Sequence, residues 1–271
     1  MKLQDSALID IHHHCIPGVD DGPRTLEEAA ELCQMAREDG VTTVIATPHV
    51  LRGEWQNGSR ALLERQLSLL RQRVGPEPRL FLGSEYFFDY EMNEILQSGS
   101  GIIPLAGSRY FLVEFAASAI PPLVEQPFYR AQLDGWIPVI AHPERNVVFQ
   151  SRPELLAALV ARGAKAQVTA ASISGDFGPA AKRASLRWIR SGLIHFVATD
   201  AHNPKRRPPR MSAARAIVTG QMGPEFAELL FERNPQALFD GSPLAWDPEL
   251  EPSATDRPPG FLGRLRRFIG A

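Results

Sequence analysis

The chain has 271 residues, a length that suits one large α/β domain or two small ones with a substantial buried core. Its 29 Lys and Arg residues nearly balance its 31 Asp and Glu residues, which leaves no basic footprint for nucleic acid. No apolar run reaches the length of about 18 residues that spans a membrane, and the start lacks a charged-then-apolar secretion signal, so we expect a cytoplasmic protein. The two cysteines, Cys15 and Cys33, are too few for a disulfide framework, although they leave room for one bridge.

Short apolar runs rich in β-branched residues alternate with segments of helical periodicity. Most runs are continuous in apolarity, which is typical of parallel strands covered on both faces. The predicted strands span residues 7–11, 41–47, 80–82, 110–115, 137–141, 166–169 and 195–199. Strands that alternate with helices indicate βα units, and seven of them favour an α/β fold with a closed or nearly closed barrel over an open sheet.

The best-defined helix signal follows the first strand. Thr25 and Glu28 have the spacing of a capping box, and Gly40 ends the amphipathic segment that follows. A second helix, from residue 63, is predicted to end at the Gly75-Pro76 pair. Further helices are predicted over residues 151–163, 179–192, 211–221 and 225–233.

The end of the chain differs in composition from the rest. Residues 247–259 are rich in proline and acidic residues, which predicts a disordered linker after a domain of residues 1–246. In the final FLGRLRRFIGA, an apolar face with Phe261 would oppose a basic face with Arg264. One interpretation is a weak contact with anionic lipid, which would place the protein peripherally at the inner membrane face. The other, which we favour, is a frayed tail or a helix docked on its own domain.

Metal-binding side chains follow six of the seven predicted strands. In chain order they are His12 and His14, His49, Glu85, Glu114, His142, and Asp200 with His202. Parallel barrels place their sites at the carboxyl ends of strands. A single such residue more often belongs to the core, a cap or an ion pair, but six occupied strand ends indicate a shared site.

The first of these positions lies in DIHHHCIPGVDDG, residues 10–22. Because alternate residues of an extended segment point the same way, His12 and His14 can meet one ion while His13 faces elsewhere. A purification tag is the alternative, but a tag would not be preceded by a strand or followed by a Pro-Gly turn. The motif therefore predicts a metal site.

The carboxylates support the same interpretation. Glu85, Glu114, Asp200 and one of Asp20 or Asp21 would bring about four like charges together, which is unfavourable without cations. Nitrogen and oxygen donors without thiolate suit manganese, iron, magnesium or zinc, and the number of ligands suggests two or three ions. Three divalent ions would leave the site net positive and receptive to phosphate.

Arginines near the predicted site could bind that phosphate. Arg145 lies in AHPER, and Arg206, Arg207 and Arg210 lie in NPKRRPPR. A guanidinium matches two phosphate oxygens at once. The alternative is a surface ion pair for Arg145 and a solvated loop for the others, of which only one needs to reach the site.

Nucleophilic phosphatase motifs are absent from the sequence. A cysteine phosphatase loop needs an arginine six positions after the thiol, but Asp21 and Asp39 stand six after Cys15 and Cys33. There is also no G-x-S-x-G elbow and no G-x-x-x-x-G-K phosphate loop. The sequence therefore favours metal-assisted hydrolysis.

Taken together, the motifs resemble the polymerase and histidinol phosphatase (PHP) superfamily, and within it the bacterial capsule-type, manganese-dependent protein-tyrosine phosphatases. The matching segments are DIHHH with VDDG, ATPH, GSEY, LVEF, IAHPER, and HFVATDAHN followed by RPPRM, with NPQALF near residue 234. The resemblance implies a distorted seven-stranded (β/α) barrel of PHP type over residues 1–246. His13 departs from the pattern, as do residues 247–271.

The resemblance also implies site residues. The implied ligands of a trinuclear manganese site are His12, His14, Asp21, His49, Glu85, Glu114, His142, Asp200 and His202. Arg145 and Arg207 would handle the phosphate, and Asp20 or a water would donate the proton to the leaving phenolate. The implied partner is the phosphorylated, tyrosine-rich tail of a membrane-associated autokinase that controls capsule or exopolysaccharide synthesis.

Two other functions remain open from the sequence. A small-molecule phosphomonoesterase, such as a histidinol-phosphate phosphatase, would use the same metals with a deeper pocket. A non-catalytic regulatory subunit of a polysaccharide export system would depend on the tail, but the complete set of ligand-type residues argues against it.

Overall fold

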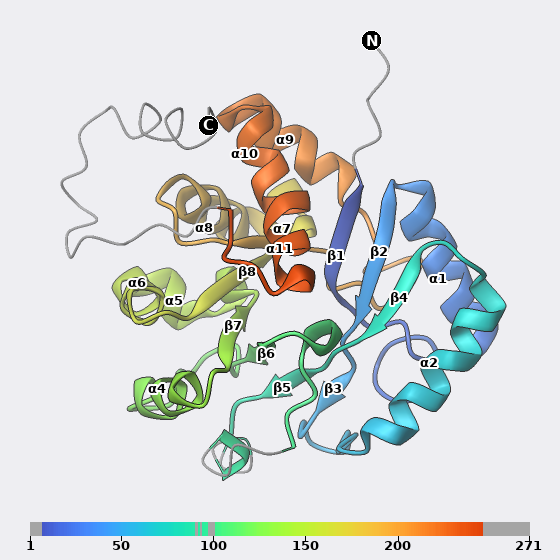
Figure 1. The fold of residues 1–271 in the computed structure, drawn as a ribbon. Coiled ribbons are helices and arrows are strands. Elements are labelled where there is room, and N and C mark those ends of the chain that lie inside the picture. Colours follow the sequence, from blue (N-terminus) through green and yellow to red (C-terminus); the bar gives the residue numbers. More distant parts are fainter. Residues whose placement is uncertain (1–6, 90–91, 93, 97–100, 246–271) are drawn as a thin grey trace.

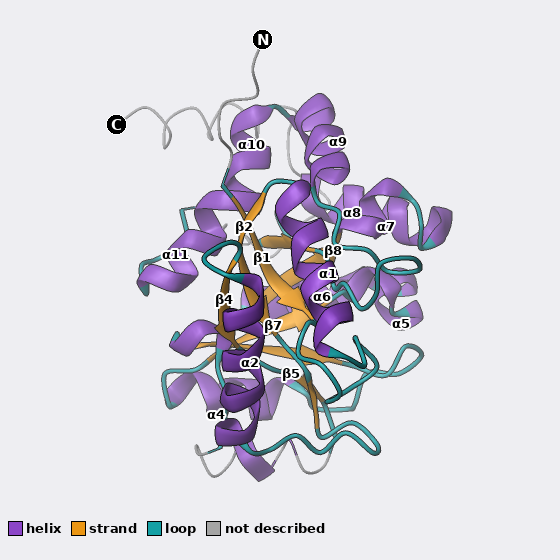
Figure 2. Cartoon of the chain, turned by 90° about the vertical axis from the view of Figure 1, so that its right-hand side faces the viewer, coloured by secondary structure: helices purple, strands orange, loops and turns teal. Residues whose placement is uncertain are grey.

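A computed structural model describes residues 7–89, 92, 94–96 and 101–245. Within this range, parallel strands form the centre of the molecule and helices lie around them (Figure 1; Figure 2). No described helix combines the length and the apolar character needed to cross a bilayer. The predicted linker and amphipathic tail, residues 247–271, lie outside the described residues.

The strands form two sheets, and all neighbouring strands are parallel. The first sheet has the order β1-β2-β4 and consists of β1 (Leu8–His13), β2 (Val41–Ala46) and β4 (Arg79–Leu82). The second has the order β3-β5-β6-β7-β8-β9 and consists of β3 (His49–Val50), β5 (Glu85–Phe87), β6 (Tyr110–Glu114), β7 (Ile137–Ala141), β8 (Lys165–Thr169) and β9 (Phe196–Ala198).

The prediction of a single seven-stranded barrel is not confirmed, because two stretches of chain pass from the first sheet to the second. β2 ends before Pro48, which has no N–H for a ladder, and β3 follows it. Beside this break, β4 ends before Gly83, and β5 follows. A Cβ on Gly83 would lie 2.8 Å from Ile45 Cγ2 and 2.9 Å from Leu105 Cδ2, so glycine permits the close approach.

The segments at the ends of β1 and β9 also join the two sheets, on the side away from Pro48 and Gly83. Asp200 N donates to His12 O at 2.8 Å, and His14 N donates to Ala201 O at 2.9 Å. The buried Asp10 carboxylate reinforces this contact by accepting from Thr199 N at 3.0 Å. These bonds bring the first and last predicted metal-binding segments together.

Strand residues divide between two apolar cores. On β6, Tyr110 and Leu112 pack with residues of the neighbouring strands, whereas Phe111 packs among residues of the surrounding helices. The pairing of β1 with β2 shifts register between Asp10 and His13. This irregularity lies where the buried side chains of β1 change from apolar, as at Ile9 and Ile11, to the histidines His12 to His14.

The strongly periodic helices agree with their predictions. They are α1 (Leu26–Glu38), α2 (Arg60–Val74), α8 (Gly178–Arg190) and α9 (Ser212–Met222). At the start of α1, Thr25 Oγ1 accepts from Glu28 N at 3.2 Å. The Glu28 carboxylate accepts from Arg24 N at 2.7 Å, one residue before the position expected of a capping box.

The other helices agree with the prediction less completely. The helix predicted over 151–163 is α6 (Pro153–Ala161), which Pro153 begins in its first turn. The helix predicted over 225–233 is α10 (Pro224–Glu228) followed by a π-helical turn (Leu229–Arg233), and α11 (Asn234–Asp240) follows it over the NPQALF segment. Among the described residues, α4 (Glu125–Leu133) and the short helices α5 (Val147–Ser151) and α7 (Ala170–Ser174) were not predicted. Short 3₁₀ turns cover Leu105–Gly107 and Pro143–Arg145.

Candidate metal centre

The structure brings all nine predicted ligands together in three overlapping groups. The groups are His14, Asp21, His49 and His202; His12, His14, Glu85 and Asp200; and Glu85, Glu114 and His142. Within each group, one nitrogen or oxygen atom per residue lies within 4.8 Å of the others. His14 belongs to the first two groups and Glu85 to the last two, so the groups form one continuous cluster.

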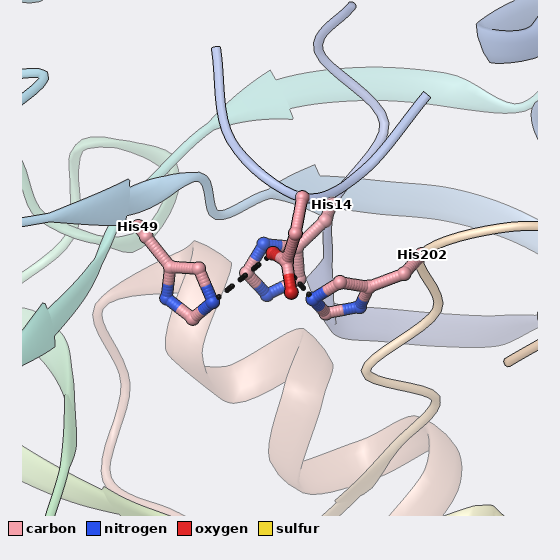
Figure 3. A group of neighbouring side chains, drawn as sticks. His14, His49 and His202 are labelled. Carbon is pink, nitrogen blue, oxygen red and sulfur yellow. Dashed lines mark ion pairs between the residues drawn. The ribbon is translucent and has the colours of Figure 1, made fainter. Parts of the chain in front are cut away.

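The histidines of the first group face one another at the strand ends (Figure 3). His49 Nε2 lies 3.4 Å from Asp21 Oδ1, and His202 Nε2 lies 3.1 Å from the same oxygen. His14 and His49 are buried, but the Asp21 side chain is 41% exposed. Asp21 therefore closes this group from the solvent side.

The second and third groups are more deeply enclosed. His12 Nε2 lies 3.3 Å from both Glu85 Oε2 and Asp200 Oδ1. His142 Nε2 lies 2.9 Å from Glu85 Oε1 and 3.4 Å from Glu114 Oε2. All five side chains are buried, so their charges are shielded from water.

Three histidines have their Nδ1 atoms held by oxygen atoms that can only accept a hydrogen bond. His12 Nδ1 donates to Gln167 Oε1 at 3.0 Å, His14 Nδ1 to Asp20 Oδ2 at 2.7 Å, and His202 Nδ1 to Asp200 O at 3.0 Å. In the neutral imidazole, these bonds place the proton on Nδ1 and leave Nε2, which is turned toward the cluster, as the nitrogen that can bind a metal. Metal-bound histidines are oriented in this way by their outer partners.

Asp20 is held inside the loop after β1. Its Oδ2 also accepts from His49 N at 3.1 Å, and its Oδ1 accepts from Gly22 N at 2.9 Å. A Cβ on Gly22 would lie only 2.6 Å from His14 O, so the tight turn requires glycine. These contacts suit a residue that orients His14 better than one that donates a proton to a leaving group.

Two non-glycine residues of the cluster have left-handed backbone conformations. His142 follows β7 with φ 32°, and Asp200 follows β9 with φ 52°. Such conformations cost about 1–3 kcal/mol each and are found where the surroundings fix them, often at functional sites. At each of these two residues, the backbone changes direction where the strand ends beside the cluster.

Three arginines surround the carboxylates, and one of them was not predicted. Arg145 Nη2 lies 2.6 Å from Asp200 Oδ2, and Arg207 pairs with the same oxygen. Arg52 Nε lies 2.9 Å from Glu114 Oε1, and its Nη1 lies 2.6 Å from His49 Nε2. Its position three residues after His49 was the only available signal. Arg206 and Arg210 are exposed and do not line the site.

Burial and charge set the protonation of the cluster. Burial alone would raise the pKa of Asp200, but Arg145, His12 and Arg207 outweigh it and hold that pKa well below its usual range. Burial and Arg145 would lower the pKa of His142, but Glu114 and Glu85 raise it to about 9. Without metal, therefore, the carboxylate of Asp200 is ionised and His142 carries a proton at neutral pH.

A pocket of about 740 Å³, counting its open mouth, lies over the second and third groups. All three arginines line it together with His49, Glu85, Glu114, His142 and Asp200. Its remaining walls are largely apolar and include Phe87, Phe115, Ala116, Ala117, Pro143 and Phe149. The pocket can therefore hold an anion beside the cluster and an apolar group next to that anion.

His13 faces away from the cluster, as predicted. It is buried beside Cys15, and neither of its ring nitrogens has a nitrogen or oxygen hydrogen-bond partner among the described residues. Cys15 and Cys33 are free thiols, so the single bridge that the sequence left open is not formed. Contact with Cys33, together with burial, raises the pKa of the Cys15 thiol well above its ordinary value. Neither thiol has the character of a nucleophile.

The donor set fits divalent metal ions. Buried Glu85 Oε2, Asp200 Oδ1 and His202 Nε2 make no hydrogen bond of acceptable geometry within the described part of the chain, although each lies within 3.3 Å of another nitrogen or oxygen of the cluster. Buried polar atoms without partners are costly, and cations between them would remove that cost. The donors are imidazole and carboxylate without thiolate, which suits manganese, iron, magnesium or zinc.

Comparison with known proteins agrees with this geometry. Residues 8–240 match the family described as "Capsular polysaccharide synthesis, CpsB/CapC". The tyrosine-protein phosphatase YwqE of Bacillus subtilis is 37% identical over 227 residues, which cover 83% of this chain and 89% of YwqE. The putative tyrosine-protein phosphatase CapC of Staphylococcus aureus is 37% identical over 74% of this chain and 79% of CapC.

A solved structure extends the similarity to three dimensions. It comes from work on YwqE of Bacillus subtilis and CpsB of Streptococcus pneumoniae, described as unique metal-dependent tyrosine phosphatases. It superposes on this chain with a TM-score of 0.84 and 35% sequence identity. The match covers 91% of this chain and 99% of the other. The resemblance drawn from the sequence motifs is thus confirmed.

Proposed function

The chain belongs to the CpsB/CapC family of capsular polysaccharide synthesis, and from this we infer that it is a metal-dependent protein-tyrosine phosphatase. The observation that carries the inference is the cluster of nine nitrogen and oxygen donors in three overlapping groups beside an arginine-lined pocket. A complete set of donors next to a phosphate-sized anion site is the arrangement that metal-assisted phosphate hydrolysis needs.

We assign the metal ligands by group. His14, Asp21, His49 and His202 would hold one ion, His12, His14, Glu85 and Asp200 a second, and Glu85, Glu114 and His142 a third. Manganese is our first expectation for the native metal, and iron, magnesium and zinc also fit the donors. Bound divalent ions would supply Lewis-acid activation of a water for in-line attack on phosphorus.

The protein's own residues bind the phosphate and position the donors. Arg145 and Arg207 lie at the pocket wall, where their guanidinium groups can take two phosphate oxygens each. Their present partner, Asp200, would pair with metal instead, which frees both arginines for the substrate. Asp20 and Gln167 hold the rings of His14 and His12, so the donors need no rearrangement when metal binds.

The walls of the pocket support an aryl phosphate as the substrate. Phe87, Ala116 and Ala117 provide apolar surface beside the arginines, where the ring of phosphotyrosine can lie. We propose that the biological partner is the phosphorylated, tyrosine-rich tail of a membrane-associated tyrosine autokinase. Residues 1–246 would carry the activity, and residues 247–271 would be a linker and tail that is dispensable for turnover in solution.

Rates on two substrates test this function against the small-molecule alternative. The metal-loaded protein should hydrolyse a phosphotyrosine peptide with a higher kcat/KM than histidinol phosphate. A preference for histidinol phosphate would assign the site to the small-molecule class, and no turnover of either substrate would support the regulatory-subunit alternative.

A further inference from the structure

We propose that residues 203–210, here called the basic loop, dock anionic side chains that flank the phosphotyrosine of the substrate. The proposal rests on the protein-tyrosine phosphatase function inferred above. It concerns residues that the chemistry at phosphorus does not use, and it defines what kind of peptide the site prefers. The ligand group that we propose is a carboxylate, and preference for a second phosphate is an outcome that the test distinguishes.

The basic loop is fixed by its own hydrogen bonds. Asn203 Oδ1 accepts from the backbone N–H groups of Arg206 at 2.7 Å and of Lys205 at 3.3 Å. Arg207 O accepts from His202 N at 3.0 Å and from Asn203 N at 3.3 Å, which closes the loop at its base. Pro208 follows directly and restricts the backbone further. The loop is thus anchored to His202, a residue of the metal cluster.

The cationic residues of the basic loop face two different environments. Arg207 turns inward, lines the pocket and pairs with Asp200. Lys205 and Arg206 are exposed, and so is Arg210 at the end of the loop. Lys205, Arg206 and Arg210 have no ion pair with any described residue, whereas Arg52 and Arg145 at the pocket each have one.

Three unpaired positive charges next to a phosphate site have an electrostatic consequence. The chain as a whole carries a formal net charge of −2, so this concentration of positive charge is local. The backbone of this loop needs no further ordering when an anion binds, and its unpaired cations attract anions over about 10 Å at moderate ionic strength. Lys205 and Arg206 directly precede Arg207 in the closed loop, so a peptide whose phosphotyrosine lies beside Arg207 brings its neighbouring residues toward this exposed part of the loop.

Peptides that differ only in their flanks test the proposal. Three phosphotyrosine peptides are compared at low salt with the metal-loaded full chain: one with neutral flanks, one with glutamates and one with a second phosphotyrosine. We expect kcat/KM for the glutamate peptide to exceed that for the neutral peptide by about tenfold, because each exposed ion pair contributes only modestly to binding and the loop offers up to three of them. About 0.5 M salt should remove the difference.

Variants show whether the basic loop causes the preference. In Lys205→Ala/Arg206→Ala/Arg210→Ala, the ratio of kcat/KM between anionic and neutral peptides should fall to about one, and Lys205→Glu/Arg206→Glu should reverse it. The control is Arg37→Ala/Arg73→Ala, which removes two exposed basic residues in the last turns of α1 and α2. These turns precede the starts of β2 and β4, whereas the cluster lies at the strand ends, so this variant should keep the ratio.

The outcomes separate the proposal from the function on which it rests. If the neutral peptide is hydrolysed but the flanks do not change kcat/KM, or if the loop variants keep the ratio, the docking surface is excluded and the phosphatase function stands. If no phosphotyrosine peptide is hydrolysed, the function itself is wrong. Comparison of the two anionic peptides identifies whether carboxylate or phosphate is the preferred flank.

Discussion

Gln167 Oε1 accepts a hydrogen bond from His12 Nδ1 at 3.0 Å, across 155 residues of sequence. Gln167 lies on β8 and is fully buried, and its carbonyl oxygen turns His12 Nε2 toward Glu85 and Asp200. An orienting residue of this kind prepares a ligand before the metal arrives.

Gln167→Leu should therefore weaken metal binding about 10- to 100-fold, the usual effect of losing an outer-sphere partner. Competition with a fluorescent chelator measures the affinity. Ser185→Ala is the control, because it removes another buried hydrogen bond, Ser185 Oγ to Ala181 O at 2.9 Å, on α8. Unchanged affinity in Gln167→Leu would show that His12 is oriented without this bond.

Gly22 is the tightest point of the loop that carries Asp20. Gly22→Ala would place a Cβ 2.6 Å from His14 O and 2.9 Å from Asp20 Oδ1. Overpacking of this kind costs about 1–3 kcal/mol of the free energy of unfolding, and the displaced loop should also lose metal. Chemical denaturation and metal analysis of the purified variant measure the two effects. Gly58→Ala meets only Gln56 O at 3.8 Å and should behave like the parent protein. Equal behaviour of the two variants would contradict the role given to Gly22.

Arg52 bridges Glu114 and His49 at the pocket wall. Once these two residues bind metal, its guanidinium is free for the phosphate, as for Arg145. Arg52→Ala should then lower kcat/KM about 10- to 100-fold and raise the inhibition constant of inorganic phosphate, because a charge-assisted contact is lost. Arg60→Ala, an exposed residue at the start of α2, is the control. If Arg52→Ala instead binds phosphate normally but loses metal, Arg52 supports the donors rather than the substrate.

The raised pKa of His142 makes metal binding dependent on pH. In the metal-free protein this pKa is about 9, so a proton occupies the imidazole at pH 7 and must leave before metal binds. The loss of this proton alone should raise the apparent affinity by up to about tenfold per pH unit between pH 7 and pH 9, and the raised pKa values of His14 and His49 act in the same direction. The protonated form also stabilises the metal-free protein, an effect present below the ordinary pKa of 6.5 and lost as pH rises through about 9. Chelator competition at pH 7, 8 and 9 measures the first effect, and a flat profile would contradict it.

The strand-end pattern located most of the candidate site because it is a local property of the sequence. A buried run followed by a histidine or carboxylate places that side chain at one rim whenever the strands are parallel. Eight of the nine residues of the cluster lie at or just after the end of a predicted strand, and Asp21 is the exception in a loop. In the structure, His49 and Glu85 begin the short strands β3 and β5 that follow the predicted strand ends. The choice of Asp21 over Asp20 came from the family resemblance, and the structure gives the two residues different partners.

Other features depend on contacts that no local pattern contains. The passage of the chain between sheets at Pro48 and Gly83 depends on the close approach of Gly83 to Ile45 and Leu105. Nothing in the local sequence distinguishes Gln167 from other strand residues, and only the fold brings it to His12. Helix α4 was missed because the prolines around it obscure its periodicity, although Pro127 is compatible with a first turn.

The most direct test of the metal-dependent function combines metal analysis with a phosphotyrosine peptide assay before and after chelation. The protein should contain two to three divalent ions per chain, lose turnover when they are removed and regain it when manganese is added. Turnover that persists after exhaustive chelation, with metal analysis confirming its removal, would contradict the metal mechanism.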